Sequence, residues 1–262
     1  MELSRILLEK KDGVATIILN RPDKLNAIDQ EMLIELQTAL ADVDHEESIR
    51  VVVITGAGKA FSAGADLKST ASFLHDPLKT EEWFRLLHQT YNAIENFTKP
   101  VIAAVNGMAL AGGLELVEAC DLVIAAEDAR LGDQHANFGL VPGGGGTQRL
   151  PRLIGIRRAK ELLLTGRWLS AIEAKEMGLV NWVAPSGKLG DVVKEITDDL
   201  VKNKSSMASR QIKRLVNSGI QGDLGTGLEL EIQGVLRHCD TEDFAEGIDA
   251  FKDKRRPIFK GK

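Results

Sequence analysis

Apolar residues form short blocks of strand length along the first part of the chain. Four blocks, at 14–20, 51–55, 101–106 and 122–126, are rich in β-branched residues and almost continuously apolar. Unbroken apolar character favours strands that are buried on both faces, as in a sheet covered by helices. The pattern therefore predicts four strands at the centre of the fold.

Helical spacing replaces this pattern between the blocks. Every third or fourth residue is apolar in 31–43, beginning at Met32, and the same spacing returns in 80–97, beginning at Phe84. Each segment therefore predicts a helix with one apolar side. Strands that alternate with such helices indicate an α/β fold.

Glycine is concentrated in three loops. The chain has 25 glycines among its 262 residues, about a tenth, where roughly 7% is usual. Segments 56–67 and 107–116 each follow a predicted strand and lead into a helical stretch, and 139–150 holds a third cluster. Because glycine lets a backbone approach other groups closely, these loops are candidates for backbone contacts with a ligand.

The last part of the chain has a different character. Ser170 and Glu173 form a capping box that predicts a helix ending near Gly178. From about residue 190 onward the chain is helix-forming, charged and poor in glycine, apart from a short glycine-containing stretch. We therefore expect a core with the active site over residues 1–190 and a helical region over 191–262.

Charge and composition exclude several classes of protein. The net charge is −5 at pH 7 and the isoelectric point is about 5.6, which argues against a nucleic-acid partner. The segment 252–262 is locally basic, with six basic residues and one acid. We expect no signal peptide, no membrane partner and, from only two distant cysteines, no disulfide framework. These features predict a cytoplasmic protein.

Two of the glycine loops offer backbone hydrogen-bond donors. Gly112 and Gly113 open an apolar helix, where free N–H groups and the helix dipole favour an anion. The loop from Ser62 to Asp66 offers a second set of donors after a different strand. An oxyanion hole needs two N–H groups that converge on one oxygen, and neighbouring strand ends would supply them. The alternative is that glycine serves only helix-to-sheet packing.

Motifs of several other chemistries are absent from the sequence. It contains no GxxxxGK[ST], no GxGxxG after a strand and no HExxH, and its five histidines are scattered. We therefore expect neither a nucleotide-binding loop of these kinds nor a metal site.

Four strings in register resemble the crotonase (enoyl-CoA hydratase/isomerase) superfamily. They are FSAGADL at 61–67, KPVIAAVNGMALAGGLEL at 99–116, CDLVIAAEDARLG at 120–132 and GLVPGGGGTQRLPRLIG at 139–155. The resemblance covers nearly the whole chain. It implies a crotonase-type spiral of repeated ββα units, with a C-terminal helical region that assembles a homotrimer, often paired into a hexamer. It also implies an acyl-CoA thioester substrate, with coenzyme A as part of the substrate and no metal or redox cofactor.

The resemblance also assigns binding residues by position. It places the oxyanion hole at the backbone N–H groups of Ala65 and Gly112, which would hold the thioester oxygen as an enolate forms. Lys254, in the basic C-terminal segment, stands where a family residue reaches the 3′-phosphate of coenzyme A, in some cases from a neighbouring subunit. The places that line the adenine pocket of coenzyme A in the family are filled here by Lys24, Ala27, Ala63, Asp66 and Leu67.

The catalytic pair departs from the family pattern. Hydratases of this family use two glutamates, 20 positions apart, to hold a water and add it across the α,β double bond. Glu115 fills the first place, but His135 fills the second. An imidazole, with an ordinary pKa of about 6.5, suits proton transfer at neutral pH, so Glu115 as base and His135 as acid would support hydration. The alternative is that His135 only fills its loop.

The same pair would support other reactions. We expect hydration of a trans-2-enoyl-CoA to a 3-hydroxyacyl-CoA, with isomerisation, decarboxylation or C–C hydrolysis of a β-dicarbonyl compound as alternatives. Relatives that hydrolyse β-diketones use an aspartate close to the place of Gly144, which weakens the hydrolase alternative. We expect Asp133 in a surface loop, with replacement of the missing acid as the alternative, and Glu118 facing solvent or a salt bridge. Trp83 and Phe84 lie in a helix that borders the acyl pocket in the family.

Overall fold

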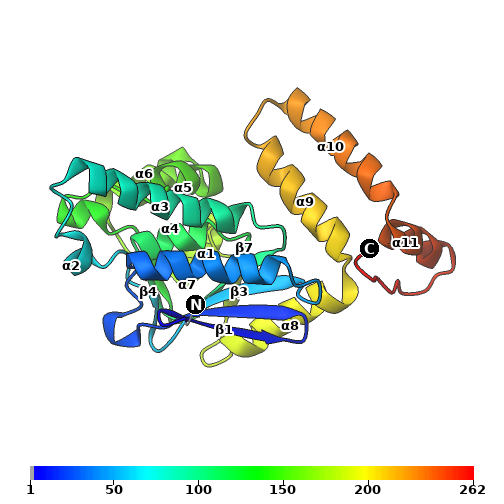
Figure 1. Cartoon of the computed structure of the whole chain (residues 1–262), viewed down its shortest axis with the longest axis horizontal. Helices are drawn as coiled ribbons and strands as arrows, with labels where there is room; N and C mark the ends of the chain where they lie inside the picture. Colours follow the sequence, from blue (N-terminus) through cyan, green and yellow to red (C-terminus); the bar gives the residue numbers. More distant parts are fainter. Residues whose placement is uncertain (1–2) are drawn as a thin grey trace.

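The strands of the chain form two separate β-sheets. A computed structural model describes residues 3–262 (Figure 1). The larger sheet has the order β1-β2-β3-β5-β7-β10, in which only the β1–β2 pair is antiparallel. Its strands are β1 (Ile6–Lys11), β2 (Val14–Leu19), β3 (Val51–Gly56), β5 (Val101–Val105), β7 (Leu122–Ala126) and β10 (Trp182–Ala184).

The smaller sheet has the order β4-β6-β8-β9, with parallel pairs except for β8 and β9. Its strands are β4 (Ala60–Ser62), β6 (Met108–Leu110), β8 (Arg130–Gly132) and β9 (Leu169–Ser170). Three times in succession, a strand of the larger sheet is followed directly by one of the smaller sheet, and a helical segment then follows. The expected spiral of repeated ββα units is therefore confirmed.

Eleven α-helices occupy the described part of the chain. They are α1 (Gln30–Asp44), α2 (Leu67–Thr70), α3 (Pro77–Glu95), α4 (Gly112–Glu118), α5 (Gly146–Ile154), α6 (Ile156–Thr165), α7 (Ala171–Met177), α8 (Leu189–Asn203), α9 (Ser206–Gly219), α10 (Leu224–Cys239) and α11 (Glu242–Lys252). The chain also has two 3₁₀ turns, η1 (Pro22–Lys24) and η2 (His135–Phe138). No helix among residues 3–262 is long and apolar enough to cross a membrane.

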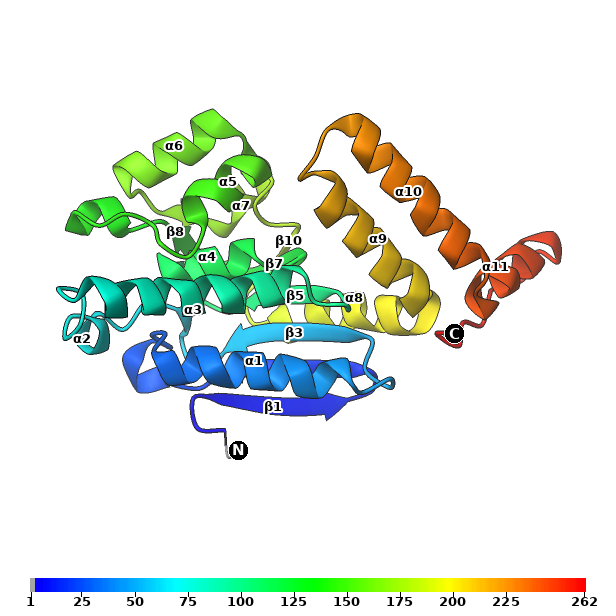
Figure 2. The same cartoon turned by 45° about the horizontal axis from the view of Figure 1, so that its top comes forward.

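Both faces of the larger sheet are buried, as the unbroken apolar blocks predict. Alternate residues of β3, such as Val52 and Ile54, enter the main core with residues of α1 and α3. Their neighbours Val51 and Val53 face the other way and pack with apolar residues of α8. Figures 1 and 2 show α1 and α3 side by side over the sheet. The four predicted strands are confirmed.

Capping residues set the ends of the predicted helices. Asp29 accepts a hydrogen bond from Met32 N at 2.9 Å, so α1 begins at Gln30. The second predicted helix begins at Pro77, three residues early, because Asp76 caps it and proline favours the first helical position. The capping box of Ser170 and Glu173 is present at the start of α7.

The C-terminal helices extend away from the two sheets. Figures 1 and 2 show α9, α10 and α11 on one side of the molecule, at the opposite end from α2. The expected division at residue 190 falls at the start of α8, whose apolar side still packs on the larger sheet. An ion pair between Lys213 of α9 and Asp121, 2.7 Å long, joins the extending helices to the core.

Candidate active site

One cavity brings together the four groups that were predicted to carry chemistry. Ala65, Gly112, Glu115 and His135 all line a cavity of about 110 Å³. They follow three neighbouring strands of the smaller sheet, because β4 pairs with β6 and β6 pairs with β8. The carboxyl ends of parallel strands meet at one edge of a sheet, so this topology explains the convergence.

The backbone around Ala65 leaves its N–H group free. Ile28 N donates to Gly64 O and Asp66 N donates to Ile28 O, both at 2.8 Å, in a short parallel bridge. In a parallel bridge the residue between these two bonds directs its own N–H away from the partner segment. Among residues 3–262 the Ala65 N–H has no acceptor, and Ala65 lines the cavity.

Gly112 supplies the second free N–H group. It is the first residue of α4, so its N–H has no partner within the helix. Ala111 before it has φ +48° and ψ −120°, a conformation that is strained for an L-residue. The two donor loops are in close contact, because a Cβ atom at Gly64 would lie 3.0 Å from Gly112 N. The arrangement suits an oxyanion hole.

Glu115 lies one turn into α4 and is only 1% exposed. Its Oε1 accepts hydrogen bonds from Gly144 N at 2.7 Å and Gly146 N at 2.8 Å. Burial raises the pKa of Glu115 despite these two donors. The carboxyl group is therefore held at one oxygen, and its Oε2 remains available for proton transfer.

The hydrogen bonds to Glu115 explain the third glycine cluster, at 139–150. A Cβ atom at Gly144 would lie 2.7 Å from Glu115 Oε2 and 2.8 Å from the Tyr91 ring. At Gly143 it would lie 2.1 Å from the Phe84 ring. Only a run without side chains can wrap so closely around the carboxylate, so the loop is glycine-rich because Glu115 is buried within it.

His135 is paired with Asp133. Its Nδ1 lies 3.0 Å and 2.9 Å from the two carboxylate oxygens of Asp133. Burial of the ring favours the neutral form, but the bonded carboxylate outweighs it and raises the pKa of His135. With Nδ1 engaged, Nε2 is the ring nitrogen left for the cavity. His135 also lines the cavity of about 110 Å³, so its ring is placed to face a bound substrate.

Two expectations about neighbouring acids are wrong. Asp133, expected in a surface loop, is 1% exposed because it supports the His135 ring from inside the fold. Glu118, expected to face solvent or a salt bridge, is 6% exposed, and its Oε2 has no hydrogen-bond partner among residues 3–262. Burial, reinforced by the charge of Glu115, raises the pKa of Glu118 well above its ordinary value.

The remainder of the cavity is mainly apolar. Leu74, Trp83, Phe84 and Leu87 line it, so the aromatic pair does border the cavity as expected. Tyr91 also lines it, and its hydroxyl donates to Gly112 O at 2.7 Å, which ties α3 to the start of α4. An uncharged hydrocarbon group fits such a lining.

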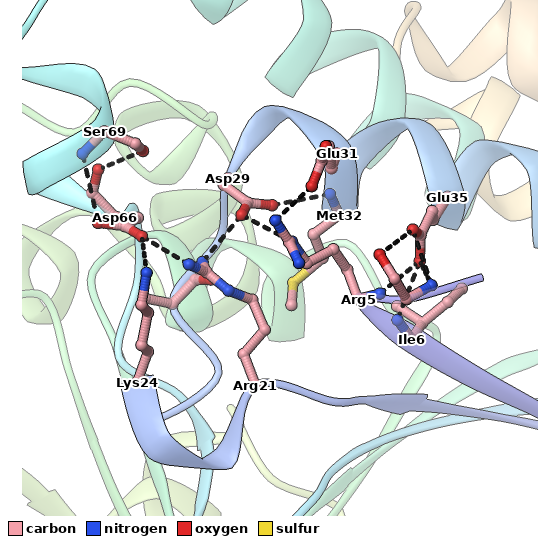
Figure 3. A network of polar contacts seen from close by, with 12 residues as sticks. Arg5, Ile6, Arg21, Lys24, Asp29, Glu31, Met32, Glu35, Asp66 and Ser69 are labelled. Carbon is pink, nitrogen blue, oxygen red and sulfur yellow. Dashed lines mark hydrogen bonds and ion pairs between the residues drawn. The ribbon is translucent and has the colours of Figure 1, made fainter. Parts of the chain in front are cut away.

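Residues assigned to coenzyme A by resemblance fall into three places. Ala63 and Leu67 line a second cavity of about 330 Å³, which shares Ala65 and His135 with the first. Lys24 and Asp66 belong to one polar network (Figure 3), and Arg21 of that network also donates to Ala27 O. Lys254 follows α11, at the far end of the molecule from α2 (Figure 1), so the chain does not bring it to its own cavity.

Two contacts of buried polar residues near the site were not predicted from the sequence. Asp133 stands two positions before His135, a spacing that lets a loop carboxylate reach the following ring. Arg21 follows β2, and its guanidinium group reaches Asp66 from 45 residues away. The first contact had a local signal in the sequence, whereas the second depends on the fold.

Comparisons with known proteins agree over nearly the full length of the chain. The model of the enoyl-CoA hydratase/isomerase family matches residues 9–262. The putative enoyl-CoA hydratase/isomerase YngF of Bacillus subtilis is 44% identical over 96% of both chains. The crotonyl-CoA hydratase of Syntrophomonas wolfei is 38% identical over 99% of both. The solved structure of an enoyl-CoA hydratase from Bacillus anthracis superposes with a TM-score of 0.93 at 44% identity, covering 99% of this chain and 100% of that one.

Proposed function

Since the chain belongs to the enoyl-CoA hydratase/isomerase family and is an enzyme of that family, we propose that it hydrates a trans-2-enoyl-CoA to a 3-hydroxyacyl-CoA. The observation that carries the proposal is the cavity in which two free backbone N–H groups meet a buried carboxylate and a carboxylate-supported imidazole. Relatives with hydratase names, such as the short-chain-enoyl-CoA hydratase of Clostridium acetobutylicum, which is 37% identical over 98% of this chain and 97% of its own, support it.

The oxyanion hole acts on the thioester oxygen. The N–H groups of Ala65 and Gly112 donate to this oxygen, and their donation strengthens as negative charge moves onto it from the attacked double bond. Donors fixed in place before the reaction need no reorganisation, and one such donor typically contributes about 3 kcal/mol to transition-state stabilisation.

Glu115 and His135 divide the proton transfers. Glu115 Oε2 takes a proton from water while the oxygen of that water bonds to C3, and the electron pair of the double bond moves into the enolate. The protonated His135 then gives its Nε2 proton to C2, which collapses the enolate back to the thioester. The neutral ring keeps its Nδ1 proton toward Asp133, the tautomer that this carboxylate favours. Proton transfer from Glu115 to His135 restores the starting state.

Coenzyme A would lie along the second cavity. Ala63 and Leu67 line it, and Lys24, Ala27 and Asp66 join one polar network through Arg21 and Lys24, so these five residues remain the proposed contacts for the nucleotide end. We assign Lys254 the 3′-phosphate contact of a neighbouring copy, because α11 extends away from its own site. The absence of a metal or redox cofactor, a cytoplasmic location and the absence of a nucleic-acid partner remain predictions.

A trimer, or a hexamer of two trimers, would cover the apolar side of the extending helices. Eight apolar residues there are between 51% and 78% exposed, largely at spacings of three or four: Ile212, Val216, Ile220, Leu224, Leu228, Ile232, Val235 and Leu236. A contiguous apolar surface of this kind is typical of a protein interface. Light scattering that reports only a monomer at working concentration would contradict this assembly.

Hydration is tested with crotonyl-CoA and longer 2-enoyl-CoA thioesters, by loss of the absorbance of the conjugated thioester. We expect turnover by the wild-type chain. If no chain length is hydrated and His135→Glu creates the activity, the site serves another reaction. Hydrolysis of a β-dicarbonyl compound is disfavoured, because Gly144, near the place of the aspartate in such enzymes, has no room for a side chain.

A further inference from the structure

The segment that carries the Ala65 donor is fixed by backbone hydrogen bonds and by the side chain of its neighbour Asp66. Three backbone hydrogen bonds of 2.8 to 2.9 Å join Ala63, Gly64 and Asp66 to the loop at 25–28. The Asp66 side chain caps α2 by accepting from Ser69 N at 3.4 Å. Both the loop and this cap must stay in place for the Ala65 N–H to keep its direction.

Arg21 connects the loop at 25–28 to Asp66. Figure 3 shows its guanidinium group between Asp66 and Asp29. Nη2 donates to Asp66 Oδ2 at 2.8 Å, Nη1 donates to Ala27 O, and Nη1 lies 3.2 Å from Asp29 Oδ2. One planar group therefore holds the Asp66 carboxylate, the loop at 25–28 and the cap of α1 together.

Burial of the Arg21 guanidinium group strengthens its contacts. Arg21 is 7% exposed and Asp66 is 8% exposed, so water screens their attraction little. The hydrogen bond from Arg21 holds the pKa of Asp66 below its ordinary value. Arg21 lines neither the substrate cavity nor the cavity beside it, so it does not face the reacting end of the substrate.

We propose that Arg21 is a positioning residue of the oxyanion hole: its guanidinium group fixes Asp66 and Ala27 and thereby aims the Ala65 N–H at the thioester oxygen. This inference rests on the proposed function, because it requires an oxyanion at that place. A misplacement of about 1 Å at a reacting centre can cost roughly a hundredfold in rate. Arg21 therefore acts on turnover without touching the substrate.

The experiment compares Arg21→Lys with Arg5→Met. Lysine keeps the positive charge, but its single ammonium group cannot reproduce the planar fork across three acceptors. Arg5 is the matched control, because it bonds Asp29 in the same network, at 3.0 Å, and touches neither Ala27 nor Asp66. We expect Arg21→Lys to lower kcat roughly ten- to a hundredfold, with a smaller rise in KM because Ala27 and Asp66 are also proposed contacts of coenzyme A, and Arg5→Met to keep wild-type kcat.

A second readout reports on the oxyanion hole without any hydration. A bound 3-ketoacyl-CoA forms an enolate with its own absorbance, and the pH at which it forms measures how well the site stabilises the negative oxygen. We expect this pH to rise in Arg21→Lys and to stay at the wild-type value in Arg5→Met. Free guanidinium ion should partly restore both enolate formation and kcat in Arg21→Ala.

The outcomes separate the two proposals. An unchanged enolate titration in Arg21→Lys overturns the role of Arg21, and so does an equal loss of kcat in Arg5→Met. If the wild-type chain stabilises the enolate but hydrates no enoyl-CoA, the proposed function fails while the titration still decides on Arg21. If the wild-type chain does not stabilise the enolate at all, the oxyanion hole and the role of Arg21 are both wrong.

Discussion

The carboxylate of Asp133 lies 2.9 Å from Nδ1 of His135 and is almost completely buried. This contact sets the chemical properties of the histidine that stands where glutamate is the family pattern. It fixes the tautomer of the ring, leaves Nε2 for the cavity and raises the pKa of His135. A protonated imidazole can then serve as the acid.

Removing this support shifts the pH profile. In Asp133→Asn the ring loses its anionic partner, so the pKa of His135 falls and the protonated acid is lost at a lower pH. We expect the alkaline decline of kcat to move to lower pH, together with a lower maximum. The profile of kcat against pH from crotonyl-CoA hydration measures the shift. Asp128→Asn, at an exposed site, is the control. A profile identical to wild type would remove Asp133 from the mechanism.

Glu115 is expected to contribute to turnover far more than to binding. Glu115→Gln keeps the size of the side chain and an oxygen for the Gly144 and Gly146 donors, but it removes the base. We expect kcat to fall by roughly 10²- to 10⁴-fold, the usual contribution of general acid–base catalysis. Affinity for a non-reacting acyl-CoA, measured by calorimetry, should change little. Wild-type turnover in this variant would exclude Glu115 as the base.

Gly144 is expected to tolerate no side chain. A Cβ atom there would lie 2.7 Å from Glu115 Oε2, so Gly144→Ala must displace the carboxylate or the loop. We expect a loss of stability of about 1 to 3 kcal/mol from overpacking, and a large loss of kcat. Gly190→Ala is the control, since its Cβ meets nothing within 4 Å and it lies in α8. Urea unfolding and hydration assays on both variants test this, and equal behaviour would contradict it.

Glu118 is expected to make stability fall as pH rises. Its pKa is raised in the folded state, so the folded chain keeps the proton that the unfolded chain releases above its ordinary pKa of 4.5. The stability associated with the neutral form is present below that pH and is lost as pH rises toward the folded pKa. Glu118→Gln has no such proton, so its free energy of unfolding should rise relative to that of the wild type as pH increases. Urea unfolding of both proteins at several pH values measures the difference, and parallel curves would refute it.

Local patterns were sufficient for four strands of the larger sheet and for several of the helices. The block at 51–55 predicted β3 because both faces of that strand are buried, and the capping box of Ser170 and Glu173 predicted the start of α7 and an end near Gly178. The start of α3 was missed by three residues, since the prediction followed the apolar stripe and not the cap at Asp76. The spacing of apolar residues therefore predicts which side chains are buried, but it locates helix ends poorly.

The sequence by itself determined the alternation of strands and helices and the glycine loops at 56–67 and 107–116, because each depends on residues close together in the chain. The spiral, the donors at Ala65 and Gly112 and the departure at His135 followed from the resemblance of its motifs to the family. Only the tertiary structure decided what surrounds them. Asp133 and Glu118 are both buried, although the sequence predicted exposure for them. The glycine run around Gly144 gained its reason from Glu115, 29 residues away. Contacts between residues far apart in the chain come from folding in three dimensions, which no local pattern records.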